Sequence, residues 1–149
     1  MRHVKVIDLT STQISISCIG DIIKRSKSLV DVNLSGDSIG TEGASAIAEA
    51  IAQSKSLTGV DLSHNEIGSE GASAIAEAIK QSKLLTKVDL NSNSIIGDEG
   101  VIAIVEAIKQ SKTLIKLNLA GNYIGCVGMV AIAEAIKQNT SMATTPFFL

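Results

Sequence analysis

Aromatic side chains are scarce in this sequence of 149 residues, which contains two phenylalanines, one tyrosine and no tryptophan. The hydrophobic share is nevertheless 45%, with 19% charged residues. Such a composition excludes a disordered chain, because it contains enough apolar material for a core. Ile, Leu, Val and Ala must fill that core, and these small side chains suit a structure that repeats one cross-section many times.

Long hydrophobic runs and concentrated positive charge are also missing. The apolar runs extend over only a few residues, whereas a membrane-spanning helix needs roughly 20. The segment 1–8 lacks the apolar region of a signal peptide. The net charge is −2, and no run of Lys and Arg stands out as a nucleic-acid-binding surface. We therefore expect neither a nucleic acid nor a membrane as partner.

Groups that perform catalysis or bind metals are equally sparse. Cys18 and Cys126 lie over 100 residues apart and resemble neither a disulfide framework nor a metal site. The only histidines are His3 and His64, and no nucleophile, base and orienting residue recur as a set. We expect a protein that is not an enzyme, has no cofactor or metal, and works in the reducing cytoplasm.

Internal repetition is the dominant feature of the sequence, and it decides the fold. Segments 38–57 and 66–85 agree at 16 of 20 positions, and segments 95–114 and 123–138 follow the same frame. One leucine per unit, at 29, 57, 85 and 114, sets a spacing of 28, 28 and 29 residues. The sequence predicts one domain over 1–149, with units of about 4–28, 29–56, 57–84, 85–113 and 114–141 and a partial unit or C-terminal cap over 142–149.

Each unit combines two hydrophobic periods. In the first half, Val60 and Leu62 alternate with polar residues, which predicts a strand with one buried face. In the second half, Ala72, Ile75 and Ile79 recur at helical spacing and form one apolar stripe. Because strand and helix fit within 28 residues, successive strands must run parallel with all helices on one side. Wide helices stacked beside narrow strands predict an arc with a concave strand face and a convex helix face.

Helix starts are predicted at one polar position of the repeat. Thr41, Ser69 and Asp98 stand where an N-cap is needed, just before an acidic residue. Cys126 occupies this position in the last full unit, so its helix is expected to begin less firmly.

The segment 57–68, LTGVDLSHNEIG, resembles the LxxLxLxxNxIG signature of leucine-rich repeats. The helix pattern and the 28-residue period resemble the ribonuclease-inhibitor-type subclass, which also occurs in Ran GTPase-activating proteins and tropomodulin. The resemblance covers nearly the whole chain and implies an α/β solenoid, a short horseshoe arc that binds macromolecules along its concave face and loop rim. It further implies that Asn65, Asn93 and Asn122 form a ladder with the backbone of adjoining turns. Asp37 and Thr12 replace this Asn in the first two units, so we expect a weaker ladder there.

The outward strand positions supply the candidate partner-binding residues. Asp61 and Asp89 are expected to be neighbours on adjacent strands, an unfavourable pair that Lys87 partly offsets. Tyr123 and His64 are expected at the loop rim. The candidates are Asp31, Asn33, Asp61, Ser63, His64, Lys87, Asp89, Asn91, Lys116, Asn118 and Tyr123. An alternative interpretation is that Leu-Asp-Leu is only a common, soluble sequence for such a strand and marks no binding site. The face also lacks the Trp and Tyr anchors that dominate interface energies.

The predicted ends of the array are weakly capped. The first strand begins almost at Met1, and Met142, Thr145 and Phe147 fall where another strand would bury its apolar residues. Pro146 suits only an edge strand, so 147–149 are expected either to fold over the last unit as a makeshift cap or to be the stub of a longer array. Open ends would permit self-association.

Function is predicted at the level of a class. The leading hypothesis is a non-catalytic scaffold that binds a protein partner. The alternatives are a GTPase-activating-type regulator, disfavoured by the presence of only two arginines, Arg2 and Arg25, and a structural spacer of a longer repeat protein. Some related modules sit in proteins that bacteria deliver into host cells, which would place this chain in the host cytosol.

Overall fold

Strands and helices alternate along the whole described chain. The computed structural model describes residues 5–10, 15–93 and 96–138. The elements are β1 (Lys5–Asp8), α1 (Ile16–Arg25), β2 (Leu29–Asn33), α2 (Gly40–Gln53), β3 (Gly59–Asp61), α3 (Gly68–Gln81), β4 (Lys87–Asp89), α4 (Gly97–Gln110), β5 (Lys116–Asn118) and α5 (Cys126–Gln138). The period-2 and helical patterns therefore predicted both the kind and the order of these elements.

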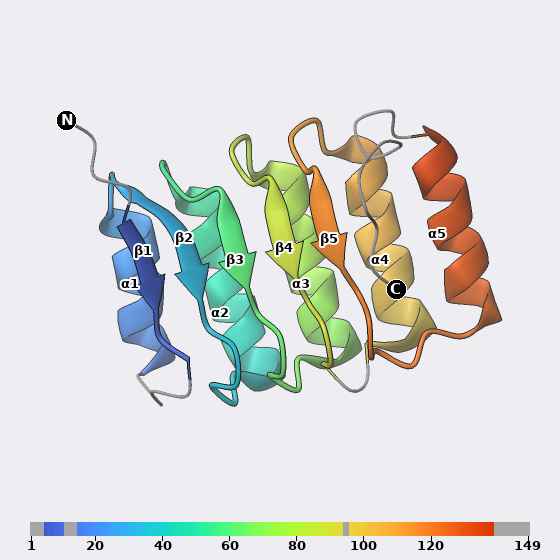
Figure 1. The fold of residues 1–149 in the computed structure, drawn as a ribbon, viewed down its shortest axis with the longest axis horizontal. Helices are drawn as coiled ribbons and strands as arrows, with labels where there is room; N and C mark the ends of the chain where they lie inside the picture. Colours follow the sequence, from blue (N-terminus) through green and yellow to red (C-terminus); the bar gives the residue numbers. More distant parts are fainter. Residues whose placement is uncertain (1–4, 11–14, 94–95, 139–149) are drawn as a thin grey trace.

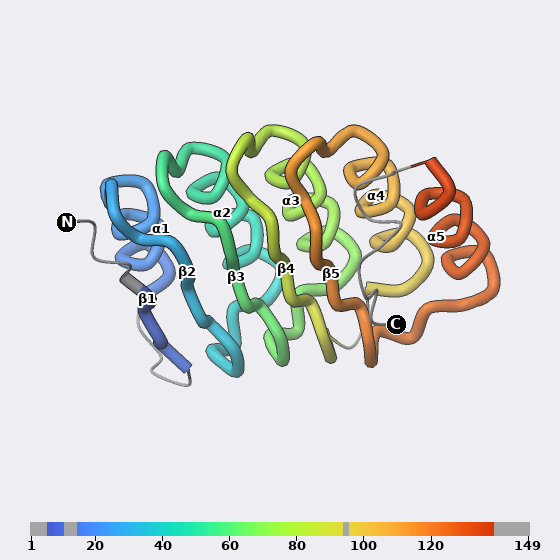
Figure 2. The backbone as a smooth tube through the Cα atoms, turned by 45° about the horizontal axis from the view of Figure 1, so that its top comes forward, coloured from blue at the N-terminus to red at the C-terminus, as the bar shows by residue number. Residues whose placement is uncertain are grey.

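The strands form one parallel sheet in the order β1-β2-β3-β4-β5, and all helices cover one of its faces (Figure 1). The register pairs equivalent repeat positions, as in Val32 with Val60 and Val60 with Val88. The tube in Figure 2 follows an arc, with the strands along one side and the helices along the other. The expected α/β solenoid with an open strand face is confirmed.

One continuous hydrophobic core runs through the units. Val60, Leu62, Ile75 and Ile79 belong to the same cluster, and each is at most 4% exposed. Each helix packs on its neighbours, so the apolar stripe of one unit is covered by the next. Truncating one of these buried isoleucines to alanine removes contacts from two units and costs on the order of 2–5 kcal/mol.

The three Asn side chains form the expected ladder, and the structure gives it a direction. Asn93 Oδ1 accepts hydrogen bonds from the backbone N–H groups of Asn65 and Ile67 in the preceding unit, at 2.9 and 3.3 Å. Its Nδ2 donates to the carbonyl oxygens of Leu62 and Leu90, both at 3.0 Å. Asn65 and Asn122 repeat the arrangement, and all three side chains are at most 1% exposed.

The first part of the ladder departs from the other units. Asp37 takes the Asn position, and its own backbone N–H donates to Asn65 Oδ1 at 2.9 Å. The ladder therefore extends as far as the turn of the second unit. Thr12, the substitution in the first unit, lies outside the described residues, as do Met1, His3 and the segment 139–149 on which the predictions about capping depend.

The predicted helix caps are wrong. Helices α2, α3 and α4 begin at the glycine that precedes each predicted cap residue, with φ of 63°, 71° and 57°, and the isoleucines before these glycines make no side-chain cap. Thr41 and Asp98 therefore lie in the first helical turn and bond to the next unit instead. The Thr41 hydroxyl donates to the Ile67 carbonyl oxygen at 2.8 Å. Ser69 likewise lies inside α3, whose first residue is Gly68.

Asp98 also corrects the expectation of a weak start for α5. Its Oδ1 accepts hydrogen bonds from the backbone N–H groups of Gly125 and Gly128, at 2.7 and 3.1 Å. The orphan donors at a helix start are thus satisfied across the unit boundary. Cys126 begins α5 without needing to supply a cap itself.

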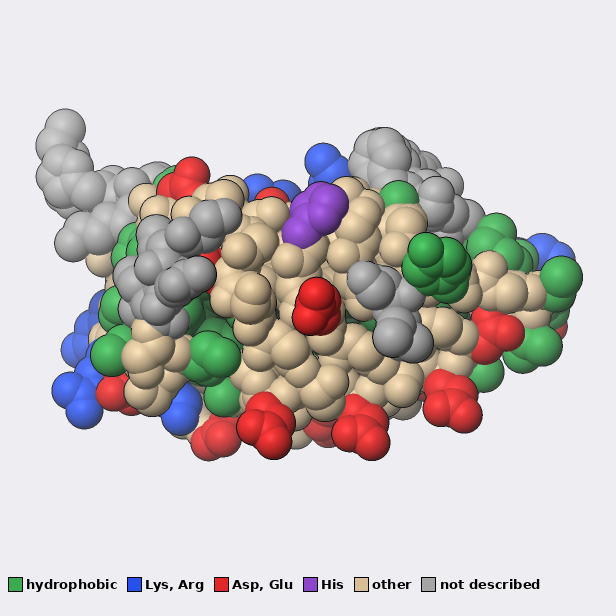
Figure 3. All heavy atoms as spheres, turned by 90° about the horizontal axis from the view of Figure 1, so that it is seen from below, with side chains coloured by type: hydrophobic (Ala, Val, Ile, Leu, Met, Phe, Trp, Pro, Cys, Tyr) green, Lys and Arg blue, Asp and Glu red, His purple; other side chains and the backbone are tan. Residues whose placement is uncertain are grey.

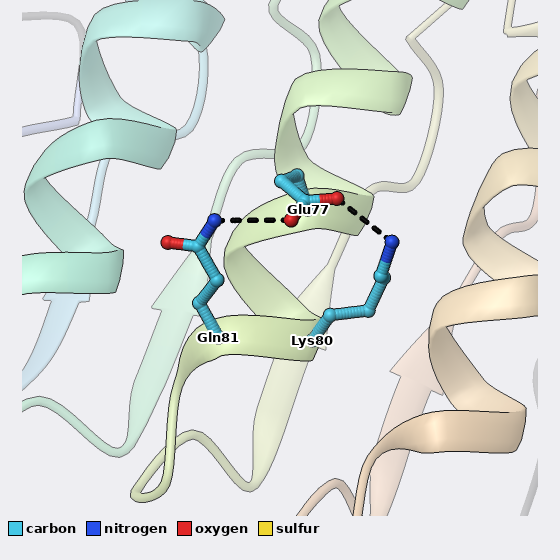
Figure 4. Close-up of polar contacts among 3 residues, drawn as sticks. All are labelled: Glu77, Lys80 and Gln81. Atoms are coloured by element: carbon cyan, nitrogen blue, oxygen red, sulfur yellow. Dashed lines mark hydrogen bonds and ion pairs between the residues drawn. The ribbon is translucent and has the colours of Figure 1, made fainter.

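The convex helix face carries mainly short-range polar contacts, apart from an ion pair between α1 and α2, Lys24 to Glu49 at 3.6 Å. Glu77 accepts hydrogen bonds from Lys80 at 2.8 Å and from Gln81 at 3.0 Å, all within α3 (Figure 4). These contacts, that from Lys80 first, lower the pKa of Glu77 below its usual range. The same i,i+3 pair recurs between Glu106 and Lys109 at 2.9 Å. Exposed pairs of this kind contribute little to stability.

Candidate functional site

A shallow hollow lies along the concave strand face. Its volume is about 330 Å³. It is lined by Val6, Asp31, Val32, Asn33, Val60, Asp61, Lys87, Val88, Asp89, Lys116 and Asn118. The sheet register aligns the outward residues in two rows, since Asp31, Gly59 and Lys87 are paired across the strands, as are Asn33, Asp61 and Asp89. Seven of the predicted binding residues therefore meet in one place.

The row of Asn33, Asp61 and Asp89 has the same structural role in every strand. Asp61 Oδ1 accepts a hydrogen bond from the backbone N–H of Ser63 at 2.9 Å, which ends the strand in a tight turn. The equivalent side chains act in the same way two residues ahead, at Asp8, Asn33, Asp89 and Asn118. The turn needs a side-chain oxygen, which Asp and Asn both supply. The fold thus requires a side-chain oxygen at this position but does not require the negative charge of Asp.

The row of Asp31, Gly59 and Lys87 contains an ion pair that spans a strand. Lys87 Nζ lies 3.2 Å from Asp31 Oδ1, although β3 runs between them. Gly59 makes this approach possible, since a Cβ there would lie 1.9 Å from Asp31 Oδ1 and 3.0 Å from Lys87 Cε. Lys87 thus forms its ion pair with Asp31 and not with Asp61 or Asp89, and its partial offset of the repulsion between those two carboxylates stays a prediction.

Asp61 and Asp89 are direct neighbours in the sheet register, as predicted. Asp89 Oδ2 accepts a hydrogen bond from Asn118 Nδ2 at 3.2 Å, and Asp61 Oδ1 accepts one from the Ser63 hydroxyl at 2.6 Å. Neutral donors rather than cations hold the two carboxylates. No described cation makes an ion pair with either carboxylate, so the pair concentrates negative charge at the centre of the hollow.

The four remaining candidates lie past the ends of the strands, on the loop rim. Ser63 is 6% exposed and bonds to Asp61 and Ser35, which gives it a structural role. Asn91 is half-buried, and its Oδ1 accepts a hydrogen bond from the Ser92 hydroxyl. His64 is exposed and has a φ of 56°.

Tyr123 is the most exposed apolar side chain of the described chain, at 85%. Its φ of 53° lies in the left-handed region, which is unfavourable for a bulky residue. The equivalent residues Ser38 and Glu66 share this conformation, with φ of 52° and 55°. An aromatic ring is thus presented to solvent from a backbone position that favours small polar residues.

Asp8 continues the row of Asn33, Asp61 and Asp89 onto β1, although it does not line the hollow. The Thr10 hydroxyl and then the Thr10 backbone N–H, at 2.5 and 3.0 Å, lower the pKa of Asp8 below its usual range. Beside it, Val6 is 60% exposed and supplies an apolar edge to the hollow. Neither residue was among the predicted site residues, although their outward strand positions were readable from the repeat frame.

The described residues give no support for a metal site, a membrane-spanning helix or catalysis by His64. Within residues 5–10, 15–93 and 96–138 no three His, Cys, Asp or Glu side chains gather in a way that could hold a metal ion. None of the described helices has the length and apolarity to span a bilayer. His64 has no catalytic partner among the described contacts.

Comparison with known proteins agrees with this architecture. The model of the leucine-rich repeat matches residues 25–48, 53–76, 81–105 and 110–133, more than half of the chain. The chain belongs to the leucine-rich-repeat family. The ribonuclease-inhibitor-type subclass stays a prediction. The sequence matches none of the curated proteins with which it was compared.

Two solved structures illustrate the fold of this repeat protein. Actin-binding site 2 of leiomodin-1 superimposes with a TM-score of 0.77 at 19% identity, over 95% of this chain and 84% of that one. The C-terminal domain of tropomodulin from Caenorhabditis elegans gives 0.74 at 17% identity, over 95% and 87%. At such identities the likeness shows the fold alone.

Proposed function

We propose that this leucine-rich-repeat protein is a non-catalytic scaffold that binds a protein partner along its concave strand face. Membership of the family and the likeness to a domain named as an actin-binding site support a protein-binding role. The residues proposed to make contact are those that line the hollow, together with Tyr123 at the rim.

The adjacent carboxylates of Asp61 and Asp89 carry the proposal. Asn33 and Asn118 show that asparagine serves the strand-ending turn equally well. Two neighbouring negative charges cost free energy through repulsion, and the turn does not require them. A partner with a positively charged segment would turn that repulsion into attraction, which makes the charge useful for binding.

Tyr123 adds an apolar anchor to this polar strip. Tyrosine is enriched at the centres of interfaces because it combines a large apolar ring with a polar hydroxyl. A ring that is 85% exposed loses much unfavourable solvent contact when a partner covers it. We therefore place the partner over the C-terminal half of the hollow, reaching the β5 rim.

A pair of charge-matched variants tests the proposal. Asp61→Asn with Asp89→Asn removes two negative charges from the hollow and keeps both turn oxygens. Glu77→Gln with Glu106→Gln removes the same charge from the convex face. Immobilised wild-type and variant proteins would capture partners from cell extract, with quantification by mass spectrometry, and each captured protein would be purified and titrated against all three.

The expected result is a partner whose affinity falls about tenfold or more in the concave variant and stays within twofold in the convex one, in line with the loss of charge-assisted contacts. Actin is a defined first probe, because the leiomodin-1 domain of similar fold is an actin-binding site. A partner set that is the same for all three proteins would contradict the concave site and favour the spacer interpretation.

A further inference from the structure

Four lysines, scattered through the sequence at intervals of 28, 28 and 29 residues, gather on one edge of the solenoid. Each lies in the loop that joins a helix to the next strand, and these loops follow one another along the upper edge in Figure 1. We call this surface the lysine edge; it consists of Lys27, Lys55, Lys83 and Lys112, all of them exposed.

Serine turns hold the lysine edge in place. Ser54 is the C-cap residue after α2, and its hydroxyl oxygen accepts hydrogen bonds from the backbone N–H groups of Ser56 and Leu57, at 3.3 and 3.1 Å. The same turn forms at Ser26, Ser82 and Ser111. Each lysine thus projects from the tip of a fixed turn.

Neighbouring turns are also tied to one another. The Ser56 hydroxyl donates to the Ser26 carbonyl oxygen at 3.1 Å, and the Thr113 hydroxyl donates to the Leu85 carbonyl oxygen at 2.9 Å. The four lysines therefore form a row on a rigid backbone. A rigid row loses only side-chain entropy when it binds, which favours contact with an extended surface.

The lysine edge keeps its charge. Lys24, Lys80 and Lys109, in the last turns of their helices, pair with glutamates at 3.6, 2.8 and 2.9 Å. None of the four edge lysines makes an ion pair with any residue that the structure describes. The edge thus presents four uncompensated positive charges, one per repeat, despite the net charge of −2 for the whole chain.

The opposite edge is acidic. The first turns of the helices start there and carry Glu42, Glu70, Asp98 and Glu99. Figure 3 looks onto this edge and shows acidic side chains in a row along it. Charge is therefore separated along the strand direction, and an anionic surface would attract the lysine edge while it repelled the far edge. This orients the molecule with its strands upright on such a surface.

Apolar side chains accompany the lysines on the same edge. Leu84 follows Lys83 and is 38% exposed, and Ile115, three residues after Lys112, is 46% exposed. The residues equivalent to Leu84 are Ser28, Ser56 and Thr113, and those equivalent to Ile115 are Val30, Thr58 and Thr86. Basic residues interspersed with exposed Leu and Ile are the combination that suits the headgroup region of a lipid bilayer.

We propose that the lysine edge docks this protein on an anionic lipid bilayer. A bilayer fits better than a nucleic acid, because a nucleic acid wrapping beyond the edge would meet the carboxylates of the concave face. Docking by the edge leaves the concave hollow and Tyr123 free, so a partner could be held beside the membrane. The expectation of no membrane partner was drawn from the absence of long apolar runs, and it did not consider surface attachment by lysines that lie one repeat apart.

Vesicle sedimentation tests the proposal with the full chain. The vesicles are phosphatidylcholine alone and phosphatidylcholine with roughly one-third phosphatidylserine. Lys55→Gln with Lys83→Gln removes two charges from the lysine edge, and Lys87→Gln with Lys116→Gln removes the same charge from the concave face. All four substitutions lie on the surface, and circular dichroism checks that each variant is folded.

Wild-type protein is expected to bind only the phosphatidylserine vesicles. The edge variant should lose about thirty-fold in partition coefficient, because each lysine near an anionic surface contributes roughly a fivefold factor. The concave variant should lose less than threefold. Raising the ionic strength from about 0.1 M to 1 M, which shortens the Debye length from about 10 to 3 Å, should abolish binding.

Three results would overturn the proposal: no preference for phosphatidylserine, equal losses in the two variants, or tighter binding of a single- or double-stranded oligonucleotide through the same lysines. The assay contains no protein partner. Its outcome is therefore independent of whether the concave face binds one.

Discussion

Lys87 on β4 and Asp31 on β2 form an ion pair of 3.2 Å across the intervening strand, over the bare backbone of Gly59. Gly59→Ala should break the pair, since the added Cβ would meet the Asp31 carboxylate. A double-mutant cycle with Asp31→Asn and Lys87→Gln should give a coupling free energy of about 0.2–1 kcal/mol for this partly exposed pair. The same cycle in the Gly59→Ala background should give a value near zero. An undiminished coupling there would show that the glycine is irrelevant to the pair.

The buried Asn ladder should dominate the stability of the turns. Asn93→Ala removes two acceptor and three donor contacts, all to backbone groups of two units. Since buried backbone groups lose their partners, the free energy of unfolding should fall by about 3 kcal/mol or more in urea titrations. Asn91→Ala, on the half-buried rim, should cost less than about 1 kcal/mol. Similar losses for both variants would refute the ladder as the main determinant.

The cap across the last unit boundary predicts a local effect. Asp98→Ala should destabilise the protein by about 1 kcal/mol, as loss of a capping side chain does, and should speed hydrogen exchange at the start of α5. Asp98→Asn keeps the acceptor for Gly125 and Gly128 and should preserve most of the protection. Glu99→Ala, at the neighbouring exposed position, serves as the control. Unchanged exchange in α5 after Asp98→Ala would contradict the cap.

Tyr123 predicts a conflict between stability and binding. Tyr123→Asn should raise the free energy of unfolding by about 0.5–1 kcal/mol, because Asn tolerates the left-handed conformation better than Tyr. The same change should weaken capture of the concave-face partner. Tyr123→Phe keeps the ring and should leave both stability and binding nearly unchanged. A Tyr123→Asn variant that gains stability and retains full binding would remove Tyr123 from the proposed interface.

The pair between Glu77 and Lys80 predicts a pH effect of defined sign. Lys80→Met should raise the pKa of Glu77 toward its usual range, because the substitution removes the Lys80 hydrogen bond, which is the contact that lowers this pKa most. A carboxylate with a lowered pKa stabilises the fold above its unfolded pKa, and this contribution disappears as the pH falls through the lowered value. Carbon-detected NMR titration of both proteins measures the shift. An unchanged titration would show that Lys80 does not contact Glu77 in solution.

Repetition made the architecture predictable. The alternation around Val60 and the helical stripe of Ile75 and Ile79 each occur in several copies, so chance patterns were excluded and the register followed from the frame. The outward residues of the hollow came from the same frame. What one unit does recurs in the next.

Contacts between units were harder to foresee. Asp98 and Thr41 looked like caps of their own helices, because the sequence does not reveal that α2, α3 and α4 each start at the left-handed glycine that precedes the predicted cap. Lys87 was expected to offset part of the repulsion between Asp61 and Asp89, and the sequence did not reveal that the missing side chain at Gly59 lets it pair with Asp31. The lysine edge was not predicted, because its four lysines lie one repeat apart and form no basic run in the sequence.

The direction of the Asn ladder has a consequence for synthesis. Each turn receives its side-chain acceptor from the unit that follows it, as the N–H groups of Asn65 and Ile67 do from Asn93. On the ribosome, a newly emerged turn must therefore wait until another 28 residues have left the exit tunnel. Co-translational folding of each unit would therefore be completed only after the next unit has been synthesised.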